Sequence, residues 1–193
     1  KTDVVIIGAG PVGLFAVFEL GLMNLKCHLI DNLDKVGGQC AELYPEKPIF
    51  DIPSRVSITA QDLTDNLLEQ ANTFNPVFHL NQQVEKVEKI NNSEWVISTN
   101  QGKVIQAKCI VIAAGAGSFV PRKPPLEGIE NFEGKNVFYS VKDKSIFKNK
   151  TVLIAGGGDS ALDWTNELSK IAKVNLIHRR KEFRAAPDSV SKM

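Results

Sequence analysis

A glycine-rich segment near the start of the chain, VVIIGAGPVG, has the residue types of a dinucleotide-binding turn. Gly8, Gly10 and Gly13 follow the spacing G-x-G-x-x-G, and an acid, Asp31, comes one helix and one strand later. In such a turn the first two glycines permit a tight bend and close approach to a pyrophosphate, while the third permits close helix packing. The acid accepts a hydrogen bond from a ribose 2′-hydroxyl. This context favours a nucleotide site over a chance glycine turn.

A second glycine-rich segment, TVLIAGGGDSA, leads to positive charge instead of an acid. Gly156 and Gly158 match the first two glycines, and Ala161 takes the third place, which the fingerprint permits. Where the first segment has its acid, this one has HRR at residues 178–180, followed by Arg184. Guanidinium groups pair with a 2′-phosphate, so the pattern predicts an NADP site. The alternative is a solvated basic turn after a strand.

Each turn needs a strand before it and a helix after it, and the sequence predicts both. The first unit reads as a strand at 4–8, a helix to about residue 22 and a strand at 26–31. From residue 150 the same order recurs, with a helix to about residue 171 and the strand VNLIH. We therefore predict an α/β chain with two Rossmann-like domains, 1–117 and 118–193, separated by a proline-rich linker at the start of the second. Both domains are expected to be incomplete at their C-terminal side.

The stretch between the two turns is predicted to hold one helix and several short strands. Residues 32–53 contain Gly37-Gly38 and three prolines, and are expected to form a long irregular loop. Thr59, with Asp62 three residues later, indicates a helix start of the capping-box kind. Strands are predicted at 77–80, 84–90, 94–99 and 104–114. In the later helix, Asp159 and Asp163 are expected to cap and solvate the start.

Charge is unevenly distributed along the chain. Residues 1–96 carry 7 basic and 13 acidic side chains, whereas residues 97–193 carry 16 basic and 9 acidic ones. The basic half is either ordinary solvated surface or a surface that attracts anions such as NADP phosphates or an acidic protein. A nucleic-acid partner is disfavoured because the cations are interleaved with acids and no aromatic platform accompanies them.

The cysteines and the hydropathy pattern exclude several further classes of protein. Cys27, Cys40 and Cys109 form no CxxC pair, so no dithiol or zinc motif is present. Cys27 and Cys109 are expected to be buried core thiols. No apolar run approaches the ~20 residues of a membrane span, and no signal peptide is recognisable, so we expect a cytoplasmic protein without a membrane partner.

Five segments together resemble a known group of enzymes. GAGPVGLFA, GGQCAELYPEKPIFDIP, VIAAGAGSFVPR, GGGDSALDW and HRRKEFRA are similar to the two-dinucleotide flavoprotein reductases of the thioredoxin-reductase type. Within that group they most resemble the thioredoxin-reductase-like ferredoxin/flavodoxin–NADP reductases. The resemblance covers nearly the whole chain. It implies the three-layer ββα domain type, FAD as the first nucleotide, NADPH as the second, a ferredoxin or flavodoxin partner and a homodimer.

The resemblance also implies roles for individual residues. At the FAD site, Gly8, Gly10, Pro11 and Gly13 would hold the pyrophosphate and Asp31 the ribose, and Tyr44 would lie flat against the isoalloxazine unless it is an ordinary loop anchor. The other residues implied at the FAD site are Gly38, Gln39, Leu43, Asp51, Val84, Gly115 and Phe119. Those implied at the NADPH site are Gly156, Gly158, Asp159, Ser160, Ala161, His178, Arg179, Arg180 and Arg184.

The chain departs from its disulfide-reducing relatives at both places where they carry a dithiol. The stretch YSVKDKSIFKNK before the second turn has no cysteine, and five residues after Cys40 stands Pro45. We therefore expect a flavoprotein oxidoreductase that passes electrons between NADPH and ferredoxin or flavodoxin without a redox disulfide and without a catalytic side chain. The alternatives are an NADPH-dependent flavin or quinone reductase and a non-catalytic NADP-binding flavoprotein.

Overall fold

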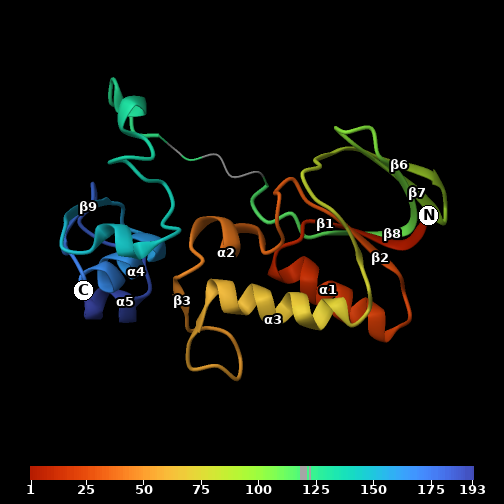
Figure 1. Ribbon diagram of the computed structural model, residues 1–193, viewed down its shortest axis with the longest axis horizontal. Coiled ribbons are helices and arrows are strands. Elements are labelled where there is room, and N and C mark those ends of the chain that lie inside the picture. The colour runs from red at the N-terminus through yellow and green to blue at the C-terminus, as the bar shows by residue number, and fades with distance from the viewer. Residues whose placement is uncertain (118–120, 122) are drawn as a thin grey trace. The chain divides into compact units, whose positions relative to one another are not determined.

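The structure is a computed structural model that describes residues 1–117, 121 and 123–193 (Figure 1). The chain divides into two compact units, 1–142 and 143–193. This division differs from the boundary predicted after Gly117. Two contacts join the end of the linker to the first unit: Val141 N donates to Leu43 O at 3.1 Å, and Lys142 Nζ lies 2.5 Å from the Glu42 carboxylate.

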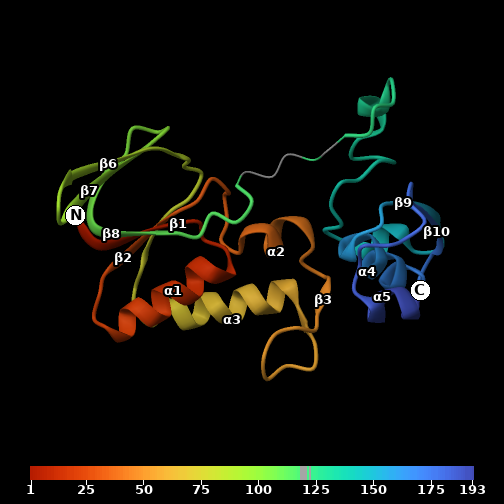
Figure 2. The ribbon, with the colours of Figure 1, turned by 180° about the vertical axis from the view of Figure 1, so that it is seen from behind.

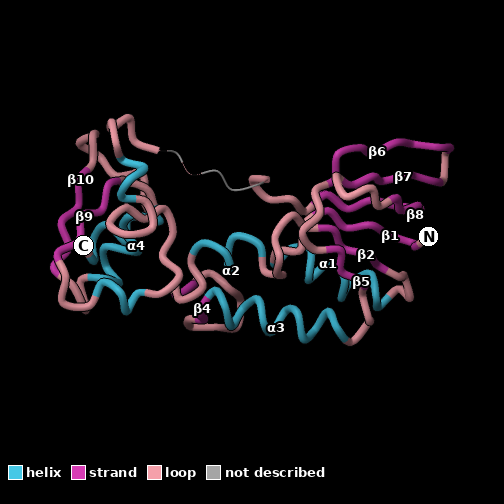
Figure 3. The backbone as a smooth tube through the Cα atoms, turned by 45° about the horizontal axis from the view of Figure 1, so that its top comes forward, coloured by secondary structure: helices cyan, strands magenta, loops and turns pink. Residues whose placement is uncertain are grey.

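The first unit is built on one six-stranded sheet (Figure 3). Four neighbouring strands of the sheet are parallel to one another, and the two remaining strands at one edge pair antiparallel. The near-continuous apolar sequence of the central strand fits its burial on both faces. In spatial order the strands are β5 (Val77–His79), β2 (Cys27–Ile30), β1 (Thr2–Ile7), β8 (Val104–Ile112), β7 (Glu94–Thr99) and β6 (Val84–Asn91).

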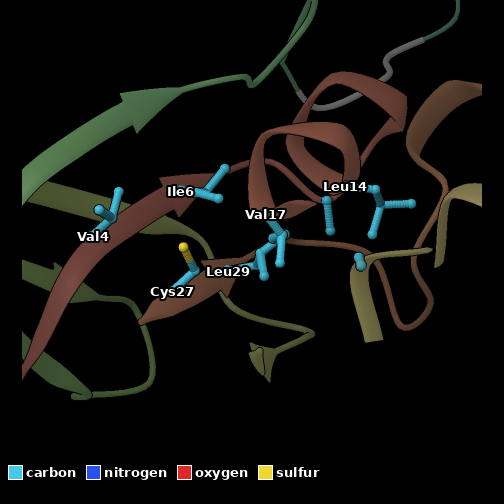
Figure 4. Close-up of a cluster of buried hydrophobic side chains, with 8 residues drawn as sticks. Val4, Ile6, Leu14, Val17, Cys27 and Leu29 are labelled. Atoms are coloured by element: carbon cyan, nitrogen blue, oxygen red, sulfur yellow. The ribbon is translucent and has the colours of Figure 1, made fainter. Parts of the chain in front are cut away.

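Apolar layers cover both faces of the parallel strands. On one face lie α1 (Pro11–Leu22) and α3 (Ala60–Asn72), and Leu14 and Val17 of α1 pack on the strands there (Figures 2 and 4). On the other face, Ile97 and Ile105 from β7 and β8 join Val5 in a second buried cluster. The parallel strands therefore have helices on one face and a second apolar cluster on the other.

The expectation of an irregular loop over residues 32–53 is wrong in part. The segment contains a short helix, α2 (Gly38–Leu43), and β3 (Pro48–Ile49), which pairs with β4 (Ile58–Thr59). Gly37 makes the helix possible, because its φ of +111° turns the chain and its N–H bonds Ala9 O at 2.8 Å. The predicted cap at Thr59 is confirmed, since its hydroxyl accepts from Asp62 N at 3.0 Å.

The second unit repeats the strand–helix–strand order as predicted. β9 (Thr151–Ala155) and β10 (Lys173–Ile177) are parallel neighbours, and α4 (Asp159–Leu168) connects them. The unit also contains η2 (Lys144–Phe147) and α5 (Pro187–Lys192), while η1 (Ile129–Phe132) belongs to the first unit. Trp164 of α4 is buried and is therefore part of the packing of this unit.

One of the two cysteines expected in the core is exposed. Cys27 is buried, and this burial raises the pKa of its thiol to about 11. Cys109 pairs with Val4 of β1 but is exposed, so the prediction for it is wrong. The cluster beneath the helices includes Val111 further along β8 and does not extend back to Cys109. None of the helices in the described residues has the length and apolar character needed to cross a membrane.

Candidate nucleotide-binding sites

The first glycine turn opens onto a cavity of about 510 Å³. It lies where the parallel strands β1, β2 and β8 end, with α2 and the start of β6 completing its wall, and its volume is within the ~300–1,000 Å³ range of cofactor pockets. Ten of the predicted FAD-site residues line it: Gly8, Gly10, Pro11, Asp31, Gly38, Gln39, Leu43, Tyr44, Val84 and Gly115.

Close packing explains the glycines of this turn. Gly8 has a φ of +106°, and a Cβ there would lie 2.3 Å from Ala113 O. A Cβ on Gly13 would lie 2.0 Å from Gly8 O, so α1 could not begin where it does. Gly13 is therefore part of the turn's packing, as the fingerprint predicts for the third glycine. Unlike Gly8, Gly10 and Pro11, with which it was expected at the pyrophosphate, Gly13 does not line the cavity.

The start of α1 at the cavity favours an anion. No side chain caps this helix end, and its first turn contains no acid. Pro11 occupies the first helical position, where its missing N–H costs nothing. The remaining first-turn amides and the positive end of the helix dipole can therefore receive a phosphate group.

Asp31 is bound to the turn as well as facing the cavity. The residue is only 9% exposed, and Oδ2 accepts from Ala9 N at 2.6 Å while Oδ1 accepts from Leu33 N at 2.9 Å. Each carboxylate oxygen keeps a further lone pair that a ribose hydroxyl can use. Asp31 thus fixes the shape of the glycine turn in addition to its predicted contact with a sugar.

Tyr44 and Cys40 form the other end of the cavity wall. The Cys40 thiol lies 3.8 Å from the Tyr44 hydroxyl, and Lys47 Nζ lies 5.4 Å from the centre of the tyrosine ring. Burial raises the pKa of Tyr44 to about 12, and burial also raises the pKa of Cys40. Both side chains are therefore neutral at physiological pH, which suits a surface for an aromatic ring.

Some predicted residues lie elsewhere, and some lining residues were not predicted. Asp51 is exposed and does not line the cavity, and Phe119 lies outside the described residues. Sequence reasoning missed the turn after β5, which brings Gln82 and Gln83 to the cavity, and Glu42 on α2. The position of Gln82 and Gln83 after a parallel strand was an available signal, because ligands bind at the carboxyl ends of such strands.

The second glycine turn is packed against the chain that follows β10. A Cβ on Gly157 would lie 2.3 Å from the ring of His178, so this imidazole occupies the space beside the turn. His178 also stacks on Phe183, with ring centres 5.4 Å apart, and its Nε2 lies 3.2 Å from Glu182 O. The structure therefore shows His178 as a packing residue of this turn.

The charged residues predicted at the second turn are exposed. Arg179, Arg180 and Arg184 form no side-chain hydrogen bond or ion pair with any residue that the structure describes. Asp159 lies in the first turn of α4 with Ser160 and Ala161 after it, but its carboxylate caps no amide of the helix, contrary to expectation. It accepts instead from Ala186 N at 2.8 Å, while Asp163 accepts from Ser189 Oγ at 3.2 Å.

A family model described as pyridine nucleotide-disulphide oxidoreductase matches residues 2–193. The chain belongs to this family, and membership implies FAD and a nicotinamide nucleotide as cofactors. The Rossmann-like α/β fold predicted from the glycine turns is thereby confirmed.

Curated relatives and solved structures refine the comparison and confirm the resemblance to thioredoxin-reductase-like enzymes. The ferredoxin–NADP reductases of Parvibaculum lavamentivorans and Mesorhizobium japonicum are each 61% identical over 100% of this chain, which spans 56% and 57% of their lengths. Lactococcus lactis thioredoxin reductase in the FR conformation superposes with a TM-score of 0.82 at 27% identity, over 100% of this chain and 61% of that one. T. acidophilum thioredoxin reductase shares the fold, with a TM-score of 0.83 at 23% identity over 99% of this chain and 60% of that one.

Proposed function

We propose that the protein is a flavoprotein oxidoreductase that passes electrons between NADPH and ferredoxin or flavodoxin through FAD, without a redox disulfide. The observation that carries this proposal is the 61% identity, over every residue of this chain, to relatives named ferredoxin–NADP reductase. The cavity at the first glycine turn and the unpaired arginines at the second support it independently.

The residues around the cavity suit FAD. The start of α1, with Gly10 and Pro11, would hold the pyrophosphate, and Asp31 would accept from the adenosine ribose. Tyr44 would shield the flavin ring, with its neutral hydroxyl next to the Cys40 thiol. Bound FAD would supply the chemistry, by accepting a hydride and releasing electrons singly to a one-electron partner.

The second turn suits NADPH in preference to NADH. Arg179, Arg180 and Arg184 lie on one loop and are exposed, so their guanidinium groups can reach the 2′-phosphate. Electrons would leave the flavin directly for the partner, because Cys27, Cys40 and Cys109 are all free thiols and no two of them form a dithiol motif.

Anaerobic reduction of the FAD-loaded, full-length protein tests the proposal. NADPH should bleach the flavin absorbance, and reduced ferredoxin or flavodoxin should then form at catalytic rates. A protein that bleaches and turns over a quinone but never reduces ferredoxin would be a quinone reductase. A protein whose flavin is not bleached by NADPH would be a non-catalytic nucleotide-binding protein, and the proposal would be wrong.

The wider organisation is also a proposal. We propose that residues 1–117 belong to an FAD domain and that residues 118–193 hold a linker, whose end contacts the first unit, and the start of an NADPH domain. The chain spans 56% of the length of the Parvibaculum relative. A cytoplasmic homodimer is proposed from the resemblance, and light scattering of the full-length protein measures its oligomeric state.

A further inference from the structure

The loop that carries the arginines is attached to the second glycine turn by backbone hydrogen bonds. This arginine loop, residues 178–186, follows β10. Arg184 N donates to Gly157 O at 2.7 Å, and Ala186 N donates to the Asp159 carboxylate at 2.8 Å. The two bonds join the far end of the loop to the turn and to the first residue of α4.

The loop's interior is filled by its own residues. The His178 ring lies against Gly157 and stacks on Phe183, and its Nε2 is 3.2 Å from Glu182 O. Arg179, Arg180 and Arg184 are all exposed. These contacts hold the loop through its backbone and its aromatic rings, and its three arginine side chains make no hydrogen bond or ion pair with the described residues.

The negative charge of Asp159 is unfavourable for direct contact with a phosphate. It is the first residue of α4, and a carboxylate there stabilises the empty helix through the dipole but repels a phosphate that approaches the same end. Its carboxylate instead accepts a hydrogen bond from the arginine loop, across 27 residues of sequence. A role through the loop explains both observations.

We propose that Asp159 is a positioning residue for the coenzyme's 2′-phosphate: it fixes the arginine loop through Ala186 N and does not bind the nucleotide itself. The inference rests on the proposed NADPH site. A loop already held in place loses less conformational entropy on binding, so the arginines engage the phosphate at lower cost. Because only the 2′-phosphate reaches the arginines, the effect should be confined to ligands that carry a 2′-phosphate.

Calorimetry with two fragments tests this on the FAD-loaded, full-length protein. The probes are 2′,5′-ADP, which carries the 2′-phosphate, and 5′-AMP, which lacks it. Asp159→Ala should weaken binding of 2′,5′-ADP about fivefold, the factor expected from one exposed charge-assisted hydrogen bond, and leave 5′-AMP within about twofold. Asp159→Asn keeps an acceptor oxygen and should retain most of the preference.

Removing the donor instead of the acceptor gives an independent variant. Ala186 has φ −54° and ψ +139°, which proline adopts, so Ala186→Pro deletes the N–H while the backbone conformation is kept. This variant should reproduce the loss of Asp159→Ala, and the double variant should lose no more than either single one. Asp188→Asn is the matched control, because it removes a nearby acid whose carboxylate accepts from Lys192 Nζ.

The outcomes separate this inference from the proposed function. If the unaltered protein does not prefer 2′,5′-ADP to 5′-AMP, the NADPH assignment itself fails. If it does prefer 2′,5′-ADP, and Asp159→Ala weakens both probes equally, Asp159 does not act through the loop. Tighter binding of both probes by Asp159→Asn would show that the acid repels phosphate directly, and this too overturns the inference. With ferricyanide as acceptor, Asp159→Ala should raise the KM for NADPH relative to the KM for NADH by about the same factor, while kcat changes little.

Discussion

Both glycine turns are fixed by an aspartate, but from opposite directions. In the first unit, Asp31 follows β2 and accepts from Ala9 N in the turn at 2.6 Å. In the second unit, Asp159 lies at the turn and accepts from Ala186 N beyond β10 at 2.8 Å. The hydrogen bond serves the same purpose in each. In the second unit the acid is part of the turn itself, and the segment after β10 carries cations, Arg179, Arg180 and Arg184, in place of an acid.

The two bonds also differ in their surroundings. Asp31 is 9% exposed and bonds two backbone amides, whereas Asp159 is exposed and bonds the single amide of Ala186. A buried, charge-assisted bond contributes more to stability than an exposed one. The first turn should therefore be rigid through its own packing, and the second should depend on the loop next to it.

Substitution of the packed glycines should give the largest effect. In Gly13→Ala the new Cβ would meet backbone, Gly8 O at 2.0 Å, which cannot move without displacing α1. In Gly157→Ala the new Cβ would meet the His178 ring at 2.3 Å, a side chain that can rotate away. We expect losses of about 3 kcal/mol and about 1 kcal/mol of unfolding free energy. Thermal unfolding of the full-length protein, with flavin content, measures both.

Gly102→Ala provides a control for these two variants. Gly102 has a φ of +74°, and a Cβ added there would meet no described heavy atom within 4 Å, so its cost is backbone strain alone. Equal losses for Gly13→Ala and Gly102→Ala would contradict the packing explanation.

Removal of the buried Asp31 carboxylate should give the second-largest effect. Asp31→Ala leaves Ala9 N and Leu33 N without their partner, and we expect a loss of about 2 kcal/mol together with at least tenfold weaker FAD binding. Asp159→Ala should cost the fold about 1 kcal/mol or less, because its bond is exposed. Unfolding midpoints and flavin titration test the pair. The comparison between the turns breaks down if Asp159→Ala is the more destabilising variant.

Thiol labelling should show that the first turn faces a ligand cavity. Cys40 lines the cavity and burial raises its pKa, so iodoacetamide at pH 8 should modify exposed Cys109 roughly tenfold faster. Cys27, whose pKa is raised to about 11, should be slowest. Adding FAD to the flavin-stripped protein should slow Cys40 alone, as peptide mass spectrometry would show. An unchanged Cys40 rate would place FAD somewhere else.

The smallest effect should be an acid sensitivity of the first unit. His28 Nδ1 and His79 Nε2 lie 3.0 Å apart on β2 and β5, and burial, as the largest cause, lowers the pKa of both from 6.5. Below pH 6.5 the unfolded chain therefore binds more protons than the folded one, and stability falls as pH decreases. Well above that pH both states are unprotonated and the pair contributes no pH dependence.

His79→Gln should reduce this loss of stability between pH 7 and pH 5. Hydrogen exchange of the β2 and β5 amides would locate the change, with the amides of β9 and β10 as internal reference. The explanation fails if the variant and the original protein lose the same protection on acidification.

Local patterns in the sequence were sufficient for the elements around each turn. Apolar strands, the glycine spacing and the capping pair at Thr59 and Asp62 predicted β1, α1, α3, β9, α4 and β10, all within a few residues of their observed ends. These features depend on neighbours along the chain. The short helix α2 was missed because it depends on Gly37, which is held by a bond to Ala9 outside its own segment.

Features that depend on distant contacts were predicted less well. Cys109 looked buried because its strand is apolar, but burial depends on how far the helices reach over the sheet. Asp159 looked like a cap, and only the folded loop brings Ala186 N to its carboxylate. Ten residues of the cavity were expected from the glycine fingerprint and the family resemblance, whereas Gln82 and Gln83 lie in a turn that neither of them covers.

The double attachment of Asp31 has a consequence for redesign of coenzyme choice. Exchanging this acid for a basic residue would cut two backbone anchors and leave their amides unsatisfied, so the change would damage the scaffold before it altered recognition. The side chains of Arg179 and Arg180 form no hydrogen bond or ion pair with the described residues, so replacing them should not disturb the fold. Evolution and protein engineering should accordingly find the recognition residues of the second glycine turn easier to change than those of the first.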